Sequence, residues 1–148
     1  MRSLLLTPLR TARSARALPR RERIDAARAV FWLLAIRLLL RVVPYAALHG
    51  AIRHLPVRRR RVPLTAFTCA RAIARGGRVV PRTTCLARAL AAECLLRRDG
   101  HSPTLSLGVM LDETRRLHAH AWLESHGILV TGGDEAARYA PLAPPSTS

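Results

Sequence analysis

The sequence is poor in aromatic and acidic residues and contains no lysine. Aromatic residues make up 4% of its 148 residues, and Asp and Glu together number 9. A core with so few rings must be built mainly from Leu, Ala and Val, and a hydrophobic content of 49% is enough to form one. This content argues against a disordered chain. The scarcity of rings also disfavours a surface that stacks single-stranded bases.

The positive charge comes from arginine alone. The chain has 25 basic residues and a formal net charge of +16, which favours an anionic partner such as nucleic acid, a membrane surface or an acidic peptide. The arginines are spread over the N-terminal segment, a predicted helix and the run Arg58–Arg61, and GC-rich coding also produces such a bias. A basic nucleic-acid-binding protein remains an alternative, with nucleic acid the disfavoured partner.

Disulfides and membrane spans are both poorly supported. The cysteines, Cys69, Cys85 and Cys94, are odd in number and have no framework spacing, which favours a reducing compartment. The apolar run Ala29–Ile36 ends at Arg37, far short of a span. We therefore expect a cytoplasmic protein. The Arg-studded segment 24–43 is expected to pack in the core or bind a partner, and peripheral membrane contact is its alternative.

Composition and periodicity divide the chain into four predicted segments. They are a basic flexible tail (1–20), a helical segment with an Arg-rich linker (21–64), a compact core (65–142) and a loose tail (143–148). Helical patterns occupy the first part of the chain, over 22–43, 45–55, 65–74 and 85–98, and the third is expected to end at Gly76-Gly77. Alternating patterns follow over 104–111, 117–124 and 128–131, and the chain is expected to be loose from Pro141 onward. Helices followed by an antiparallel meander predict an α+β fold.

One predicted helix begins at a cysteine. Pro81 and the threonines Thr83 and Thr84 form a helix start, because a threonine side chain can accept a free backbone N–H at the N-cap. Cys85 then falls in the first turn, where the helix dipole and the free N–H groups favour a thiolate. Cys69 and Cys94 occupy apolar helical positions and are expected to be buried and inert.

The strand predicted over 117–124 supplies a candidate base. His118, His120, Trp122 and Glu124 share one face of it. A nucleophilic cysteine needs an imidazole within hydrogen-bond reach and usually a third group that orients the imidazole. The order of a cysteine on a helix, a histidine on a strand and an acid after the next strand matches papain-like and transglutaminase-like sites.

The other polar and aromatic residues of this strand have simpler structural interpretations. His118 is expected to be exposed or to pack, Trp122 is either a cover over the site or a core residue, and Glu124 is either a hydrogen-bond acceptor or solvated. A zinc site built from the cysteines and histidines is disfavoured, because no pair of them has a finger-like spacing.

The short sequence motifs around Cys85 and His120 are more specific than the spacing of the two residues. They are Cys85–Leu90 (CLARAL), Leu95–Gly100 (LLRRDG), Leu107–Val109 (LGV) and Ala119–Glu124 (AHAWLE). Together they resemble the peptidase part of the lasso-peptide maturation protease, a transglutaminase-like cysteine peptidase. The resemblance extends from Cys85 to about Pro141 and is looser over 24–56. In that family the leader-binding and peptidase parts are sometimes separate chains, and this chain is expected to be the peptidase alone.

The resemblance implies a function and a site. Cys85 would be the nucleophile and His120 the base of an enzyme that removes the leader from a lasso precursor peptide, without a metal or organic cofactor. The family's third residue is an Asp soon after the His, on the following strand. This chain departs from that pattern, because its strand 128–131 runs into Gly132-Gly133 and the first acid is Asp134. Either Asp134 or a backbone carbonyl would orient His120. The implied partners are a leader-recognition protein and an ATP-dependent macrocyclase, and acyl transfer to an amine remains open beside hydrolysis.

Overall fold

The computed structural model describes residues 18–58 and 60–142. The predicted loose tail at 143–148 and most of the predicted basic tail at 1–20 lie outside the described residues, as does Arg59 in the arginine run.

Four helices of nine residues or more precede the sheet in the described part of the chain. They are α2 (Arg20–Leu39), α3 (Tyr45–Arg53), α4 (Ala66–Val79) and α5 (Cys85–Arg98). Pro44 separates α2 from α3, because a proline cannot donate the backbone N–H that a continuing helix needs. Thr65 caps α4 with a capping box that it forms with Thr68. The helices predicted over 22–43 and 45–55 therefore exist, and each ends a few residues earlier than expected.

Helix α4 continues through Gly76-Gly77, where the sequence predicted its end. The two glycines disfavour a helix by about 1 kcal/mol each relative to alanine. A Cβ on Gly76 would lie only 3.0 Å from Leu33 Cδ1 and 3.3 Å from Ala29 Cβ on α2. The glycine thus permits a close approach of α2 to α4, and this tertiary packing overrides the local preference.

The strands form one antiparallel sheet in the order β3-β2-β1-β4. Strand β1 (Thr104–Leu111) pairs along its length with β2 (Leu117–Ser125), which pairs in turn with β3 (Ile128–Thr131). After the short helix α6 (Gly133–Ala136) the chain returns as β4 (Ala140–Pro141) on the free edge of β1. Leu142 N donates to Leu107 O at 2.8 Å, so the segment just after Pro141 is paired and not loose as predicted.

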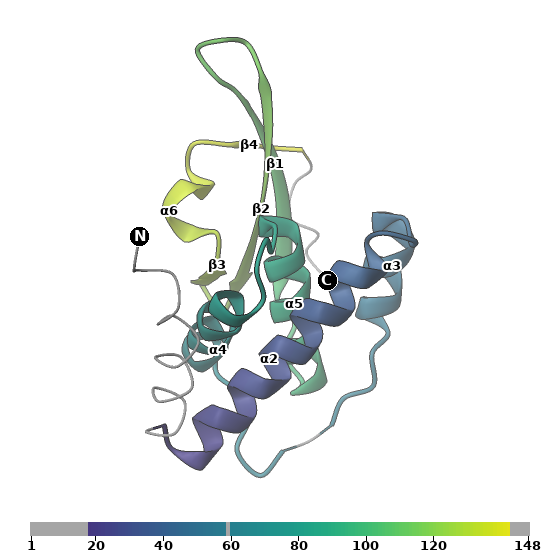
Figure 1. Cartoon of the computed structure of the whole chain (residues 1–148), viewed down its shortest axis with the longest axis vertical. Helices are drawn as coiled ribbons and strands as arrows, with labels where there is room; N and C mark the ends of the chain where they lie inside the picture. Colours follow the sequence, from purple (N-terminus) through teal and green to yellow (C-terminus); the bar gives the residue numbers. More distant parts are fainter. Residues whose placement is uncertain (1–17, 59, 143–148) are drawn as a thin grey trace, which may run out of the picture.

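Helix α5 lies at the centre of the core, between the sheet and helix α2, while α4 packs against both α5 and β3 (Figure 1). Its residues from Ala89 to Leu96 are all buried. From the sheet, Ala121 and Leu123 complete the core with exposures of 1% and 0%. The β1–β2 hairpin extends beyond the helical layer (Figure 1). The fold is α+β, as predicted, with the cysteine-bearing helix against a small antiparallel sheet.

Within the described ranges, none of the helices combines the length and the apolar character that crossing a bilayer requires.

Candidate active site

Cys85 is the first residue of α5. The Thr84 side chain caps the helix by accepting from Ala87 N at 3.1 Å, and the Thr84 carbonyl accepts from Arg88 N at 3.1 Å. The side-chain cap uses one of the N–H groups that a helix start leaves free, that of Ala87, while the bond from Arg88 N is the first regular bond of the helix. Neither bond includes the N–H of Cys85. The Cys85 side chain is half-buried. The predicted helix start is therefore confirmed, with the sulfur in the first turn.

Two arginines fix the loop that leads into Cys85. Arg37 on α2 donates to Pro81 O at 2.6 Å, and Arg88 Nε donates to Thr83 Oγ1 at 2.9 Å. Between these anchors Arg82 has a φ of 56°, a left-handed conformation that a non-glycine residue adopts only when its surroundings hold it there. The position of the cysteine is thus set by contacts from two helices.

The other two thiols are buried. Burial raises the pKa of Cys69 to about 12, although Arg28 acts in the opposite direction. Burial and the nearby Glu93 carboxylate also raise the pKa of Cys94 well above its ordinary value. Both side chains remain thiols at neutral pH and are closed to solvent, as the sequence predicted.

We expect Cys85 to be the only thiol that reacts with iodoacetamide in the native protein. The thiolate is the reactive species, and the raised pKa and burial of Cys69 and Cys94 deny them both ionisation and access. Peptide mapping after labelling at pH 7 measures this, with a guanidinium-unfolded sample as the control in which all three react. Native labelling of Cys69 or Cys94 ahead of Cys85 would contradict the choice of nucleophile.

His120 lies on β2 and is oriented by a backbone carbonyl. Its Nε2 lies 3.1 Å from Gly132 O. A carbonyl oxygen can only accept, so Nε2 carries the hydrogen and donates it. In the neutral ring Nδ1 is then the free acceptor, and this is the nitrogen that can take a proton. The carbonyl therefore fixes the tautomer that a general base requires.

Two aromatic rings stack on the imidazole. The ring of Tyr139 lies 4.9 Å from that of His120 and the ring of Trp122 lies 6.2 Å from it, both at small interplanar angles. Gly108 on β1 makes room for them, because a Cβ there would lie 2.8 Å from Trp122 and 2.9 Å from Tyr139. Trp122 stacks on the imidazole, and its role as a cover that shields the site from water stays a prediction. Tyr139 was missed, since no spacing links it to His120.

The residue that orients His120 must be a glycine. Gly132 has a φ of +75°, and a Cβ on it would lie 2.8 Å from Ala121 O, 2.9 Å from His120 Nε2 and 3.0 Å from Trp122 Cβ. No side chain fits this space without displacing the imidazole. The glycine pair after the third predicted strand was a visible signal, but it indicated a strand end and not a contact with His120.

The remaining candidates have separate positions. Asp134 belongs by its backbone to α6, and its side chain lies outside what the structure describes, so its role stays a prediction. His118 is exposed and pairs with Asp112 at 2.8 Å. Hydrogen bonds from Thr114, from the Arg116 backbone and from His118 hold the pKa of the Asp112 carboxyl well below its usual range.

Over the residues that the structure describes, no group of three or more His, Cys, Asp or Glu side chains could hold a metal ion.

The structure packs the helix of Cys85 against the strand of His120. It shows no hydrogen bond between these two side chains, both of which are described. Alternation along β2 directs Ala121 and Leu123 into the core, and so places His120 and Trp122 on the other face of the sheet. The two elements are packed together, and no hydrogen bond joins the Cys85 sulfur to the His120 imidazole.

A cysteine at a helix start and an oriented imidazole on the adjoining strand define a candidate site for thiol-dependent acyl transfer. The sequence model of the transglutaminase-like superfamily matches residues 30–144. Because this is more than half of the chain, the protein belongs to the transglutaminase-like superfamily, which includes cysteine peptidases and acyl transferases. No curated protein and no solved structure gives a match.

Proposed function

We propose that this chain is a cysteine peptidase that removes the leader from a lasso-peptide precursor in the cytoplasm. The observation that carries the enzymatic part is the hydrogen bond from His120 Nε2 to Gly132 O, which leaves Nδ1 as a proton acceptor on the strand packed against the helix of Cys85. Superfamily membership supports the chemistry. The choice of substrate rests on the resemblance of the sequence motifs around Cys85 and His120 to those of the lasso-peptide maturation protease.

The proposed reaction proceeds through an acyl-enzyme. His120 Nδ1 accepts the proton of the Cys85 thiol, and the sulfur attacks the carbonyl carbon of the scissile peptide bond. The C–N bond breaks as protonated His120 returns the proton to the leaving amine. A water molecule, deprotonated by His120, then attacks the thioester, and the Cys85 sulfur leaves and regains a proton.

The start of α5 supplies the electrostatic support for this reaction. The N–H of Cys85 is not used by the Thr84 cap, so it can donate to the oxygen of the tetrahedral intermediate. His120 lies on the face of β2 opposite to Ala121 and Leu123, which point into the core. The proposal therefore requires a rearrangement of the His120 ring or of the start of α5 that brings Nδ1 within hydrogen-bond reach of Cys85 Sγ when substrate is bound.

The proposed partners are a leader-recognition protein that presents the precursor and an ATP-dependent macrocyclase that acts after cleavage. Helix α2 offers one of them a docking surface, because Phe31, Leu34 and Leu38 are exposed by 62%, 45% and 61%. We assign this surface to the leader-recognition protein, and peripheral contact with an anionic membrane is the alternative.

The test is a cleavage assay with a lasso precursor peptide and its leader-recognition protein, which we expect to be encoded beside this chain. Mass spectrometry should find a leader that ends in a free carboxylate. A leader joined to an added amine would favour acyl transfer. An intact precursor with all partners present, together with tight, salt-sensitive binding of DNA or RNA, would favour the nucleic-acid-binding alternative.

We expect Asp134→Asn to lower turnover by less than about tenfold. The Nε2 hydrogen of His120 is already donated to Gly132 O, so its tautomer does not depend on a carboxylate. The rate of leader release at saturating precursor measures this effect. A loss of about a thousandfold or more, with an unchanged precursor affinity, would make Asp134 the residue that orients His120 and would leave the carbonyl a secondary role.

A further inference from the structure

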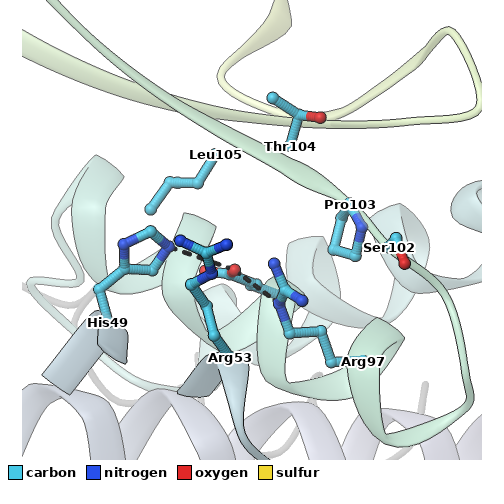
Figure 2. Close-up of a pocket in the computed structure, with 8 residues that line it drawn as sticks. His49, Arg53, Arg97, Ser102, Pro103, Thr104 and Leu105 are labelled. Carbon is cyan, nitrogen blue, oxygen red and sulfur yellow. Dashed lines mark hydrogen bonds and ion pairs between the residues drawn. The ribbon is translucent and has the colours of Figure 1, made fainter. Parts of the chain in front are cut away.

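A small cavity of about 90 Å³ lies where α3, α5 and the start of β1 meet. Residues 102–105 close one side of it, and the side chains of His49, Arg53 and Arg97 converge on it from the two helices (Figure 2). Arg53 and Ser102 are exposed and mark its opening to solvent. This volume is several times the roughly 10–15 Å³ that a single water molecule needs on the same measure, so it admits a side chain of a few atoms.

A buried carboxylate forms the floor of the cavity. Glu93 is 0% exposed and lies in the middle of α5. Its Oε1 accepts from Arg97 Nε at 2.8 Å and lies 3.3 Å from His49 Nε2 (Figure 2, dashed lines). The other oxygen, Oε2, is buried and has no hydrogen-bond partner among the described residues. A buried carboxylate oxygen without a hydrogen-bond donor raises the free energy of the folded state, so we expect a donor to occupy the cavity beside it.

The far side of the His49 ring is also engaged. The Tyr45 hydroxyl lies 3.3 Å from His49 Nδ1, and the two rings stack at 5.4 Å. Burial and the negative charge of Glu93 raise the pKa of Tyr45, so it stays a neutral hydroxyl that can donate to Nδ1. His49 Nε2 then donates to Glu93. The ring is therefore fixed from both sides and shapes the cavity.

The guanidinium groups of Arg53 and Arg97 both face the cavity, and each has N–H donors that are not used by the described residues of the protein. Arg97 uses Nε for Glu93, which leaves its terminal nitrogens available. Arg53 has no ion-pair partner in the part of the chain that the structure describes. Two arginines and one glutamate leave a net charge of one positive unit, which suits a single anion. Guanidinium groups bind carboxylates well because their donors match the spacing of the two oxygens.

We propose that this cavity binds an acidic residue of a peptide, with the carboxylate between Arg53 and Arg97 and a backbone N–H on Glu93 Oε2. Inorganic phosphate carries up to two negative charges at neutral pH, so it would meet the buried carboxylate of Glu93 less favourably than a singly charged carboxylate does. The identity of the ligand as a peptide rests on the proposed function. Glu93 lies about two helical turns, or about 12 Å, from Cys85 along α5, the length of about four extended residues.

The test measures binding and does not require catalysis. The probe is N-acetyl-aspartate N-methylamide, titrated into the full chain and followed by NMR. N-acetyl-asparagine N-methylamide is the neutral control, acetate is the carboxylate without an N–H, and inorganic phosphate is the free-anion arm. We expect the aspartate probe to bind at least tenfold more tightly than the asparagine and phosphate probes and to shift the His49 resonances. Cys85→Ala should bind it equally well.

Variants locate the binding. Arg53→Gln removes an exposed guanidinium and should weaken the aspartate probe by about tenfold, the effect of one charge-assisted hydrogen bond. Arg41→Gln removes an equal charge from an exposed position outside the cavity and should change nothing. Glu93→Gln keeps a carbonyl acceptor for Arg97 but presents an amide NH2 donor to the cavity. This variant should bind the aspartate probe more weakly and acetate more tightly than the parent chain does.

Equal binding of the aspartate and asparagine probes would overturn the proposal, as would an aspartate affinity that is unchanged in Arg53→Gln. Phosphate binding as tightly as the aspartate probe would make the cavity a general anion site and would also overturn it. A chain that binds the aspartate probe but cleaves no precursor would leave the cavity assigned and the proposed peptidase function refuted.

Discussion

Cys85→Ala and His120→Ala should each reduce leader release by at least about a thousandfold, and the double variant should lose no more than either single variant. Residues that act as one catalytic unit are non-additive in this way, because removing either one already removes the acyl-enzyme route. The measurement is the single-turnover rate of precursor cleavage. Circular dichroism and thermal unfolding should show that all three variants remain folded.

His118→Ala is the matched control for His120→Ala. The two histidines share a strand, but His118 is exposed and bonded to Asp112, whereas His120 is bonded to Gly132. We expect His118→Ala to keep turnover within about twofold, as for a surface substitution.

The comparison of the single and double variants also decides whether the Cys85 sulfur and the His120 imidazole act together. They are not hydrogen-bonded in the structure, and the proposed mechanism needs that bond to form with substrate. If His120→Ala and Cys85→Ala lose activity partially, and the losses multiply in the double variant, the two side chains act independently. Thiol catalysis assisted by His120 would then be wrong, even though the chain belongs to the superfamily.

The features that the sequence predicted well are those set by neighbouring residues. Thr84 is a good N-cap because its hydroxyl reaches a backbone N–H three residues later, and Leu86, Leu90 and Cys94 follow it at helical spacing. The alternation over Leu117–Ser125 likewise fixes which side chains share a face. These patterns placed Cys85 at a helix start and predicted the α+β fold.

The features that the sequence did not predict depend on residues that are distant along the chain. Gly76 is helical because α2 lies against it, and Pro141 joins the sheet because β1 has a free edge there. Tyr139 reaches His120 only after the chain has turned through α6. Glu93 is a buried acid among apolar neighbours. Arg97 lies four residues later on the same helix, a spacing that brings two side chains together, but His49 comes from α3 and no spacing rule links it to Glu93.

Gly132→Ala should lower the turnover of leader release by orders of magnitude with little change in the concentration of precursor at half-maximal rate. A Cβ at this position would lie 2.9 Å from His120 Nε2 and 2.8 Å from Ala121 O, so the carbonyl and the ring cannot both keep their places. The variant leaves both catalytic side chains present and displaces the group that fixes the tautomer of His120. Its effect should therefore fall on the chemical step and not on binding.

Gly127→Ala is the control that separates backbone strain from this contact. Gly127 has a φ of +74°, nearly the same as the +75° of Gly132, but a Cβ on it would have nothing within 4 Å. A non-glycine residue in this conformation costs on the order of 1 kcal/mol, so both variants should lose a similar part of their stability for that reason. Only Gly132→Ala should also lose turnover.

If both variants kept full turnover, the carbonyl of Gly132 would not orient His120, and the Asp134 carboxylate would become the leading candidate for that role. If both lost turnover equally, the loss would follow from backbone strain alone, because Gly127 makes no contact with the imidazole.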